Sequence, residues 1–459
     1  MCKMQTTDKM KRALILFTRI PLAGKTKTRM MPKLTPDACA ALHSALIKDA
    51  AKAAAGSSAD VFVCYEGERA SLNKLLCCTD VLQRSKSKVR YFPQKGDGLG
   101  VRMQQAIAAV LQKGYDAAVL TGTDIPALSA EQLNRAFRVL EERDVVLGAT
   151  KDGGYYLIGM KELQPSVFSL HTYGTGSVFA KTKEAAEKEG LSVGYTAQLS
   201  DLDTPEDLET FRVQLRSSKR LRQTVTGKFA ARHASISIIV PIYNEAATIR
   251  KLTEQLRPLL SHCEIILVDG GSTDGTAEQI DGAFHVIHSE KGRARQMNLG
   301  AQKSSGDILF FLHSDSELPP HPLGWIRKVM ETHSAGCFGI AFHSCNFFMW
   351  TCRVISNHRV KDRKVMFGDQ GIFIDRNLFF EAGMFPELPV MEDYQFSLTL
   401  KDLGVKLGMA GRRIYTSDRR FPKGTVPKLR LMWKMNRLRK QYRDGVPAEQ
   451  IAAQYRDVR

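Results

Sequence analysis

The 459-residue chain is 43% hydrophobic and 25% charged, a composition typical of folded proteins that excludes a disordered or fibrous chain. Its length predicts two to three domains, and two is our working number. A formal net charge of +18 at pH 7 suits nucleic acid, an anionic membrane surface or small phosphorylated ligands as partners. No nucleic-acid-binding motif accompanies the basic segments, so we expect no nucleic-acid partner.

Short aliphatic segments alternate with longer amphipathic ones, and this pattern begins twice along the chain. In the first half we expect strands near residues 13–17, 60–64, 117–120 and 145–147, and helices near 36–54, 100–113 and 130–142. In the second half we expect strands near 237–240, 265–268, 285–288 and 308–312, and helices near 245–259, 276–280 and 292–303. The sequence therefore predicts two α/β domains, 1–215 and 235–459, joined by a basic linker at 216–234 that lacks a hydrophobic period.

Cations and acids follow the predicted strands of the first half. Lys27 and Arg29 lie in a loop that could hold a triphosphate through backbone N–H groups and positive charge, although the Walker spacing is missing. Asp124 ends a strand in VLTGTDIP, and Asp203 precedes a helix in DLDTPED. Two carboxylates that converge on one metal ion would suit transfer of a nucleotidyl group.

These motifs resemble a family of uncharacterised sugar-transferase-like proteins related to the phospholactate guanylyltransferases and molybdopterin nucleotidyltransferases. The resemblance spans about residues 11–210 and implies a nucleotidyltransferase-like domain of the GT-A type. It also implies that Lys27 and Arg29 contact phosphates and that Asp124 and Asp203 hold a metal ion. The same fold without turnover, acting as a scaffold or regulator, is the alternative.

Polar residues also follow the predicted strands of the second half. Asp269 and Ser272 in VDGGSTDGT stand where open α/β sheets bind nucleotides, although a capped helix start would look the same. Asp315 in FFLHSDS could hold a divalent ion against a diphosphate. Glu392 and Asp393 in VMEDY could supply a general base for an acceptor hydroxyl.

The segments VPIYNEAATI, VDGGSTDGT, FLHSDSELP and VMEDYQFS together resemble the inverting family-two glycosyltransferases over residues 235–415. The resemblance implies a second Rossmann-like, GT-A-type nucleotide-diphospho-sugar transferase domain, with a mostly parallel sheet flanked by helices. It would transfer a sugar from a nucleotide-diphosphate sugar to a small-molecule or lipid-linked acceptor, with inversion. Asp393 would then be the catalytic base with Glu392 in support, and Asp315 would hold Mg²⁺ or Mn²⁺. The resemblance places four residues at the donor: Asp269 beside the nucleobase, and Pro241, Glu245 and Ser272.

Two further segments, KGRARQMN and GDQGIF, resemble a narrower subgroup linked to arsenosugar biosynthesis and close to the carotenoid-acid glucosyltransferases. Arg293 and Arg295 would suit a diphosphate, since guanidinium groups match phosphate oxygens, although helix-surface arginines would look the same. Asp369 could contact donor or acceptor, or shape a turn. The family's Q-x-x-R-W motif is replaced by TSDRRF at 416–421, which leaves the acceptor site unassigned.

The surroundings expected for the protein follow from its cysteines and its carboxyl-terminal segment. Nine cysteines, odd in number and never spaced C-x-x-C, predict reduced thiols and a cytoplasmic location. Residues 429–440 alternate apolar and basic side chains, which predicts either peripheral contact with the inner face of the cell membrane or a half-solvated helix. A non-catalytic nucleotide-sugar-binding regulator or membrane-surface scaffold competes with the enzyme, and the Glu392–Asp393 pair argues against it.

Overall fold

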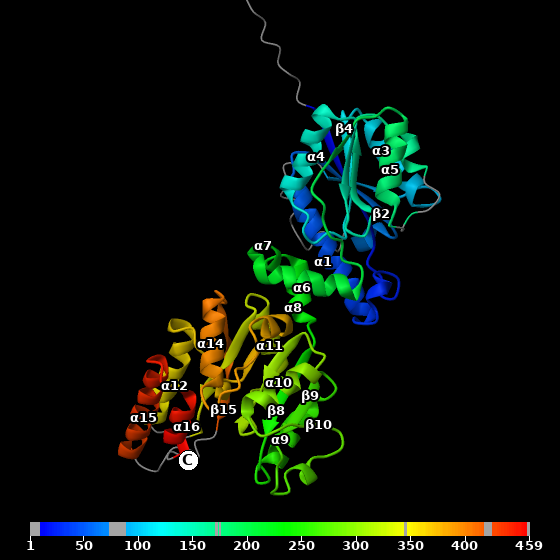
Figure 1. The fold of residues 1–459 in the computed structure, drawn as a ribbon. Coiled ribbons are helices and arrows are strands. Elements are labelled where there is room, and N and C mark those ends of the chain that lie inside the picture. Colours follow the sequence, from blue (N-terminus) through cyan, green and yellow to red (C-terminus); the bar gives the residue numbers. More distant parts are fainter. Residues whose placement is uncertain are drawn as a thin grey trace, which may run out of the picture. The chain divides into compact units, whose positions relative to one another are not determined.

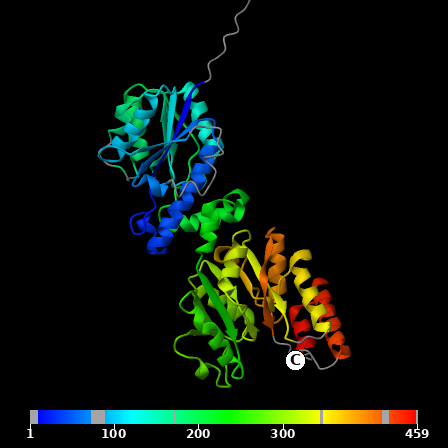
Figure 2. The same ribbon diagram turned by 180° about the vertical axis from the view of Figure 1, so that it is seen from behind.

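The computed structural model describes residues 10–72, 89–169, 173, 176–343, 347–416 and 425–456. The chain forms two compact units that divide between Ala230 and Ala231, each built around one β-sheet (Figure 1, and Figure 2 from behind). The described cysteines Cys39, Cys64, Cys263, Cys337 and Cys352 are free, whereas Cys2, Cys77, Cys78 and Cys345 lie outside the described residues. In the replacement for the acceptor motif, residues 417–421 also lie outside them.

The first unit contains a sheet whose strands run in the order β3-β2-β1-β4-β6-β5-β7. Only β6 runs antiparallel to its neighbours in the described sheet. The strands are β1 (Arg12–Arg19), β2 (Asp60–Glu66), β3 (Val89–Pro93), β4 (Ala117–Gly122), β5 (Val145–Ala149), β6 (Tyr155–Met160) and β7 (Val193–Tyr195). The helices are α1 (Pro36–Ala55), α3 (Leu99–Leu111), α4 (Ala130–Glu142), α5 (Val178–Lys188), α6 (Pro205–Ser217), α7 (Lys219–Arg222) and α8 (Val225–Arg232).

Both faces of this sheet are buried, which explains the continuous aliphatic segments in its strands. In β1, Leu14 and Leu16 pack with α1 and α4, while Ala13 and Ile15 pack on the other face with α3 (Figure 1). The helix expected at 130–142 is confirmed, and it begins at a capping box in which Ser129 accepts a hydrogen bond from the N–H of Gln132.

Apart from one added edge strand, β12, the second unit repeats this strand order. Its sheet runs β10-β9-β8-β11-β14-β13-β15-β12, and β14 is antiparallel to both of its neighbours, as β6 is in the first unit. The strands are β8 (Ile236–Ile242), β9 (Glu264–Asp269), β10 (His285–His288), β11 (Ile308–Phe311), β12 (Ser316–Glu317), β13 (Ala335–Ala341), β14 (Ile372–Asp375) and β15 (Leu407–Thr416). The helices are α9 (Ile249–Leu256), α10 (Arg293–Lys303), α11 (Pro322–Met330), α12 (Phe347–Asp362), α13 (Arg376–Glu381), α14 (Glu392–Asp402), α15 (Thr425–Arg443) and α16 (Ala448–Arg456).

Helices cover both faces of the second sheet as well. Ile238 and Val240 of β8 pack with α9 and α11, and Ile239 between them packs on the opposite face with α10. These two parallel-rich sheets flanked by helices confirm the predicted fold class. None of the described helices is long and apolar enough to span a bilayer.

Two local expectations differ from the structure. The segment expected as a linker, 216–234, forms short helices, and Leu221 and Phe229 are buried with Leu215 in the core of the first unit. The helix expected at 276–280 is only a 3₁₀ turn at Ala277–Gln279. There the Asp274 side chain accepts hydrogen bonds from the N–H groups of Ala246 and Thr276, and such side-chain bonds compete with helix formation.

Candidate active site

Two loops at the carboxyl ends of β8 and β9 are locked together by hydrogen bonds. The N–H of Asn244 donates to Ser272 Oγ at 2.9 Å, and the N–H of Thr273 donates to Asn244 Oδ1 at 2.9 Å. The N–H of Glu245 donates to Thr276 Oγ1 at 2.8 Å. Asn244 has a φ of 53°, a left-handed conformation that asparagine tolerates better than most residues. The two sequence motifs therefore form one preorganised floor.

Asp269 stabilises the second of these two loops. Its carboxylate is 3% exposed and accepts hydrogen bonds from the N–H of Gly271 at 3.2 Å and from Ser272 Oγ at 2.6 Å. His288 Nδ1 lies 3.4 Å from its Oδ2. This arrangement gives Asp269 and Ser272 a structural task, and their contact with a nucleobase stays a prediction.

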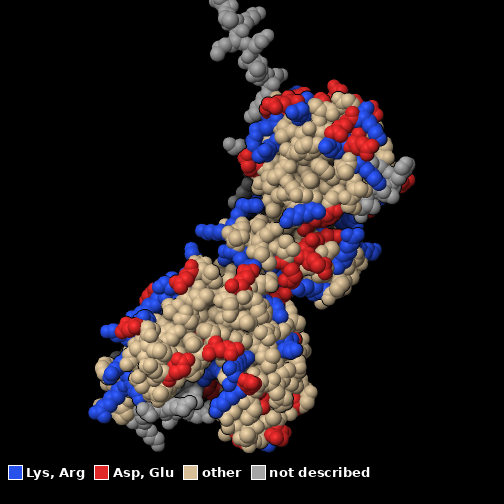
Figure 3. Space-filling view, viewed as in Figure 1, with Lys and Arg blue, Asp and Glu red and all other residues tan. Residues whose placement is uncertain are grey.

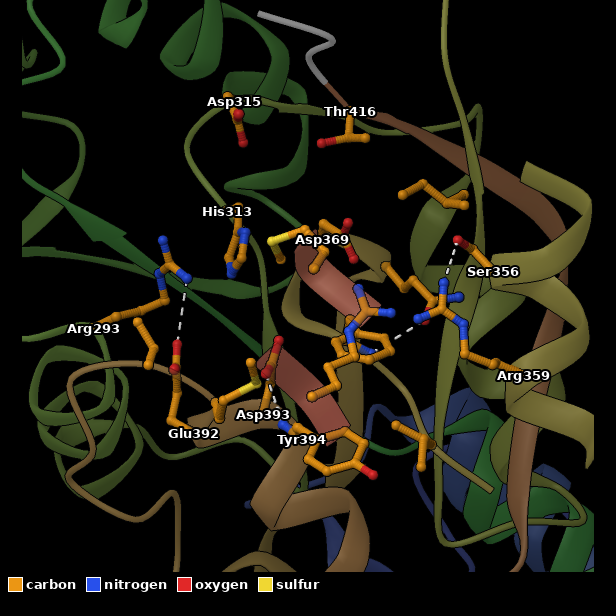
Figure 4. Close-up of a pocket in the computed structure, with 18 of the residues that line it drawn as sticks. Arg293, His313, Asp315, Ser356, Arg359, Asp369, Glu392, Asp393, Tyr394 and Thr416 are labelled. Carbon is orange, nitrogen blue, oxygen red and sulfur yellow. Dashed lines mark hydrogen bonds and ion pairs between the residues drawn. The ribbon is translucent and has the colours of Figure 1, made fainter. Parts of the chain in front are cut away.

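A cleft of about 1510 Å³ opens beside this floor, and residues from β8, α10, α12, α14 and α15 line it (Figure 4). Seven of the predicted site residues line it: Pro241, Glu245, Arg293, Asp315, Asp369, Glu392 and Asp393. Asp269, Ser272 and Arg295 are not among the described residues that line it. Arg295 instead pairs with Glu387 and Glu290 on the surface, which favours its alternative interpretation as a helix-surface arginine.

Glu392 and Asp393 begin α14 and face the cleft. Asp393 accepts hydrogen bonds from the N–H of Gly368 to Oδ2 and from the N–H of Tyr394 to Oδ1, both at 2.7 Å. Arg293 Nη1 lies 3.3 Å from Glu392 Oε1. Burial, and then the charge of Asp393, raise the pKa of Glu392, while Arg293 opposes that shift. The backbone thus holds Asp393 in one orientation, and Glu392 connects it to Arg293.

Glu245 and Asp315 lie at the other end of the cleft. Ser314 Oγ donates to Glu245 Oε1 at 2.9 Å, which ties the loop after β11 to the loop after β8. The half-buried Asp315 makes no hydrogen bond or ion pair with any described residue. Figure 4 places Asp315, His313 and Asp369 around the same space. No group of three or more His, Cys, Asp or Glu side chains in the described ranges could hold a metal by itself.

Three residues of this site were given no role from the sequence. Gln296 is buried, and its Nε2 donates to the carbonyls of Ile242 and Val268 at 2.7 Å, which joins the ends of β8 and β9. Gly368 lets its backbone approach His313, because a Cβ there would come within 2.7 Å of His313 Cε1. Arg359 reaches the cleft from α12, which is not among the helices expected from the sequence.

The first unit gathers charges at the corresponding edge of its sheet. The Lys27 side chain is 3% exposed, and its Nζ lies 3.0 Å from Asp124 Oδ2 and 3.3 Å from Asp203 Oδ1. Arg29 Nη1 lies 3.2 Å from Asp203, and His43 Nδ1 lies 3.4 Å from Asp124. The two predicted metal ligands therefore converge on an ammonium group.

These contacts shift the acidity of the neighbouring carboxyl groups. Burial disfavours ionisation of Asp124, but the Lys27 charge and the hydrogen bond with His43 outweigh it and hold the pKa well below its usual range. The Asp124 side chain is 45% exposed, so solvent screens part of this attraction. Burial and the charge of Asp152 raise the pKa of Asp201 to about 6.

Comparison with known families follows the two units. Residues 47–175 match a family described as an uncharacterized protein conserved in bacteria, DUF2064, and residues 237–385 match glycosyl transferase family 2. The chain is thus a tandem fusion of one segment similar to the first family and one similar to the second. The narrower links of the fusion protein to phospholactate guanylyltransferases and to arsenosugar biosynthesis stay predictions.

Relatives of the fusion protein align with part of it. Glycosyltransferase AglE of Haloferax volcanii is 36% identical over 111 residues, which cover 22% of this chain and 35% of AglE. The undecaprenyl-phosphate 4-deoxy-4-formamido-L-arabinose transferase of Serratia proteamaculans is 28% identical over 109 residues, 21% of this chain and 33% of that protein. The fusion protein thus spans about a third of the length of these relatives. A structure from Desulfovibrio desulfuricans G20, described as a nucleotide-diphospho-sugar transferase, is 29% identical with a TM-score of 0.42 and covers 48% of this chain and 94% of its own.

Proposed function

We propose that the second unit transfers a sugar from a nucleotide-diphosphate sugar to an acceptor hydroxyl, with inversion at the anomeric carbon. One observation carries the proposal: a single cleft brings together Arg293, Asp315 and an Asp393 held by two backbone amides. Its location at the carboxyl ends of β8 and β11 is where open α/β sheets bind nucleotides. The match to glycosyl transferase family 2 supports the same reaction class.

Asp393 would act as the general base. A carboxylate has about four lone-pair sites, so one that accepts two backbone N–H bonds can still accept a proton. As the acceptor oxygen bonds to the anomeric carbon, its proton passes to Asp393 and the bond to the diphosphate breaks. One displacement from the face opposite the leaving group inverts the centre.

Arg293 would stabilise the departing diphosphate. Its guanidinium lines the cleft and is already oriented by Glu392, so little reorganisation is needed as negative charge develops. Glu392 would act as a positioning residue because it is buried, contacts Arg293 and adjoins Asp393. We also infer that Asp269 and Ser272 act on the donor through the floor they order.

Asp315 fits a divalent cation, Mg²⁺ or Mn²⁺, that is shared with the donor phosphates. Its carboxylate has no partner in the described part of the chain, and hard cations prefer such oxygen ligands. When bound, the cation would neutralise charge on the diphosphate.

The test measures release of nucleoside diphosphate from UDP-, GDP- and dTDP-sugars with Mg²⁺ or Mn²⁺. We expect the parent to release one nucleotide, and Asp393→Asn to lose transfer by at least about 10²-fold, the usual contribution of a general base. Asp402→Asn is the matched control, because Asp402 is exposed at the far end of the same helix. Full transfer by Asp393→Asn would refute the assignment of the base.

For the first unit we infer binding of a nucleoside phosphate, with Lys27 and Arg29 as phosphate ligands. Their present partners are carboxylates, so an incoming phosphate would replace anion by anion. The unit would then either make the sugar donor or bind it. Release of pyrophosphate from a nucleoside triphosphate and a sugar phosphate would support synthesis, and nucleotide binding without release would support the binding role.

A further inference from the structure

The cleft of the second unit has a cationic side that the proposed chemistry does not use. Arg359 and Arg363 come from α12 or directly after it, and Arg439 and Arg443 come from α15. All four line the cleft. In Figure 4, Arg359 lies on the side of the cleft away from Glu392. Arginines gathered in a cleft need an explanation, because like charges repel.

Arg359 has donors without acceptors. Its Nη2 donates to Ser356 Oγ at 2.8 Å, but Nε and Nη1 are buried and have no hydrogen-bond partner among the described residues. Its guanidinium lies 4.9 Å from the ring centroid of Phe367, and that of Arg439 lies at the same distance from this ring. One aromatic ring therefore holds two guanidinium groups together.

The electrostatics of Arg359 favour the binding of an anion. Burial, and then the charges of Arg439 and Arg363, lower the pKa of Arg359 to about 10, and the charge of Asp369 opposes this shift. The side chain stays charged at neutral pH. A bound oxyanion would supply the missing acceptors and relieve the repulsion among the guanidinium groups.

The same wall is apolar between its arginines. Leu431, Met432 and Met435 of α15 line the cleft beside Arg439. Methionine and leucine side chains suit a flexible hydrocarbon. Between Met432 and Met435, Trp433 is 67% exposed, and Figure 3 shows basic side chains along this edge of the second unit. The wall therefore matches a ligand that carries both an oxyanion and an apolar body.

We propose that Arg359 and Arg439 form an acceptor subsite that binds the phosphate group of a phosphorylated, partly apolar acceptor. The subsite adjoins the base, because Phe367 is followed directly by Gly368, whose N–H binds Asp393. Four arginines favour a doubly charged phosphate over a carboxylate. The description of the ligand as an acceptor rests on the proposed transferase function, whereas the binding of phosphate does not.

The experiment measures the affinity of the full chain for hexyl phosphate, glycerol 3-phosphate and 1-hexanol by titration calorimetry. We expect saturable binding of hexyl phosphate and none of hexanol. Glycerol 3-phosphate that binds as tightly would identify a water-soluble phosphorylated acceptor, and weaker binding would identify a lipid phosphate. A parent that binds neither phosphate would overturn the subsite.

Variants locate the binding. Arg359→Gln and Arg439→Gln should each weaken hexyl phosphate by about tenfold or more, the loss of a charge-assisted hydrogen bond. Arg437→Gln is the matched control, since Arg437 is exposed on the same helix and outside the lining of the cleft, and its affinity should stay within about twofold. Arg293→Gln should also retain the affinity, which separates this subsite from the donor diphosphate. If Arg359→Gln does not fold, Arg439→Gln decides. Equal losses in Arg439→Gln and Arg437→Gln would refute the proposal, and because no sugar donor is needed, this result is independent of catalysis.

Discussion

Substituting Gly368 by alanine should damage the candidate active site without touching a charged group. The added Cβ would lie 2.7 Å from His313 Cε1 and 3.5 Å from Asp393 Oδ2. The first distance is about 0.7 Å short of an ordinary van der Waals contact, so either the His313 ring or the 367–370 segment must move. Movement of the segment would displace the N–H group that holds Asp393.

Overpacking of this kind costs about 1–3 kcal/mol of stability, and a misplacement near 1 Å can cost about 10²-fold in rate. We therefore expect Gly368→Ala to lower kcat of sugar transfer by about 10–100-fold, with a smaller change in KM for the donor. Steady-state release of nucleoside diphosphate measures both constants. Gly324→Ala in α11 is the control, because a Cβ there meets nothing within 4 Å and alanine favours a helix. A Gly368→Ala enzyme with parental kcat would refute the view that this contact orients the base.

Three further substitutions test other parts of the structure. Asp315→Ala should leave the unfolding midpoint within about 1 °C of the parent, because the Asp315 carboxylate bonds to no described residue. Metal-stimulated release of nucleotide should be lost in the same variant. A large drop in the unfolding midpoint would contradict this prediction. Lys27→Met should destabilise the first unit by about 1–3 kcal/mol, because it leaves two partly solvated carboxylates without their buried partner. Lys25→Met at an exposed position should be neutral, and denaturant unfolding distinguishes the two variants. The pKa of Asp201 is raised to about 6, so ionisation of Asp201 destabilises the folded state. This destabilisation is absent below about pH 4 and complete above about pH 6. Asp201→Asn should therefore unfold at a higher temperature than the parent at pH 7, and the difference should vanish towards pH 4; calorimetry with the same difference at both pH values would contradict the assignment.

Strands and helices with strong periodicity were predictable from the sequence. The segments at 130–142 and 117–120 fall on α4 and β4 because their apolar patterns follow from burial along a regular element. The short helices at 219–232 were predicted as linker, since their basic composition concealed two apolar residues, Leu221 and Phe229, which pack with Leu215 only in three dimensions.

The acidic residues of the candidate site were predictable because their positions directly after apolar segments are visible in the sequence. Asp315 and Asp393 are acids that follow apolar segments, and both line one cleft, while their roles in catalysis stay predictions. Contacts between distant segments were not predictable. Arg295 belongs to a motif that suited a diphosphate, but its guanidinium pairs with Glu387, which lies 92 positions away in the sequence. Arg359 could not be found either, because its importance depends on Arg439 from another helix.

Because the strand order recurs, the loop after the first strand of one unit can be compared with the equivalent loop of the other unit. After the first strand of the sheet, the first unit places Lys27 against Asp124, and the second unit places Glu245 against Ser314. A resident positive charge and a resident negative charge thus occupy equivalent loops. In the first unit a lysine supplies positive charge beside the carboxylates, whereas in the second unit the proposed divalent cation would supply it. Exchanging Lys27 and Glu245 between the two units would test whether the sign of this one charge decides if a site on this scaffold needs an added cation.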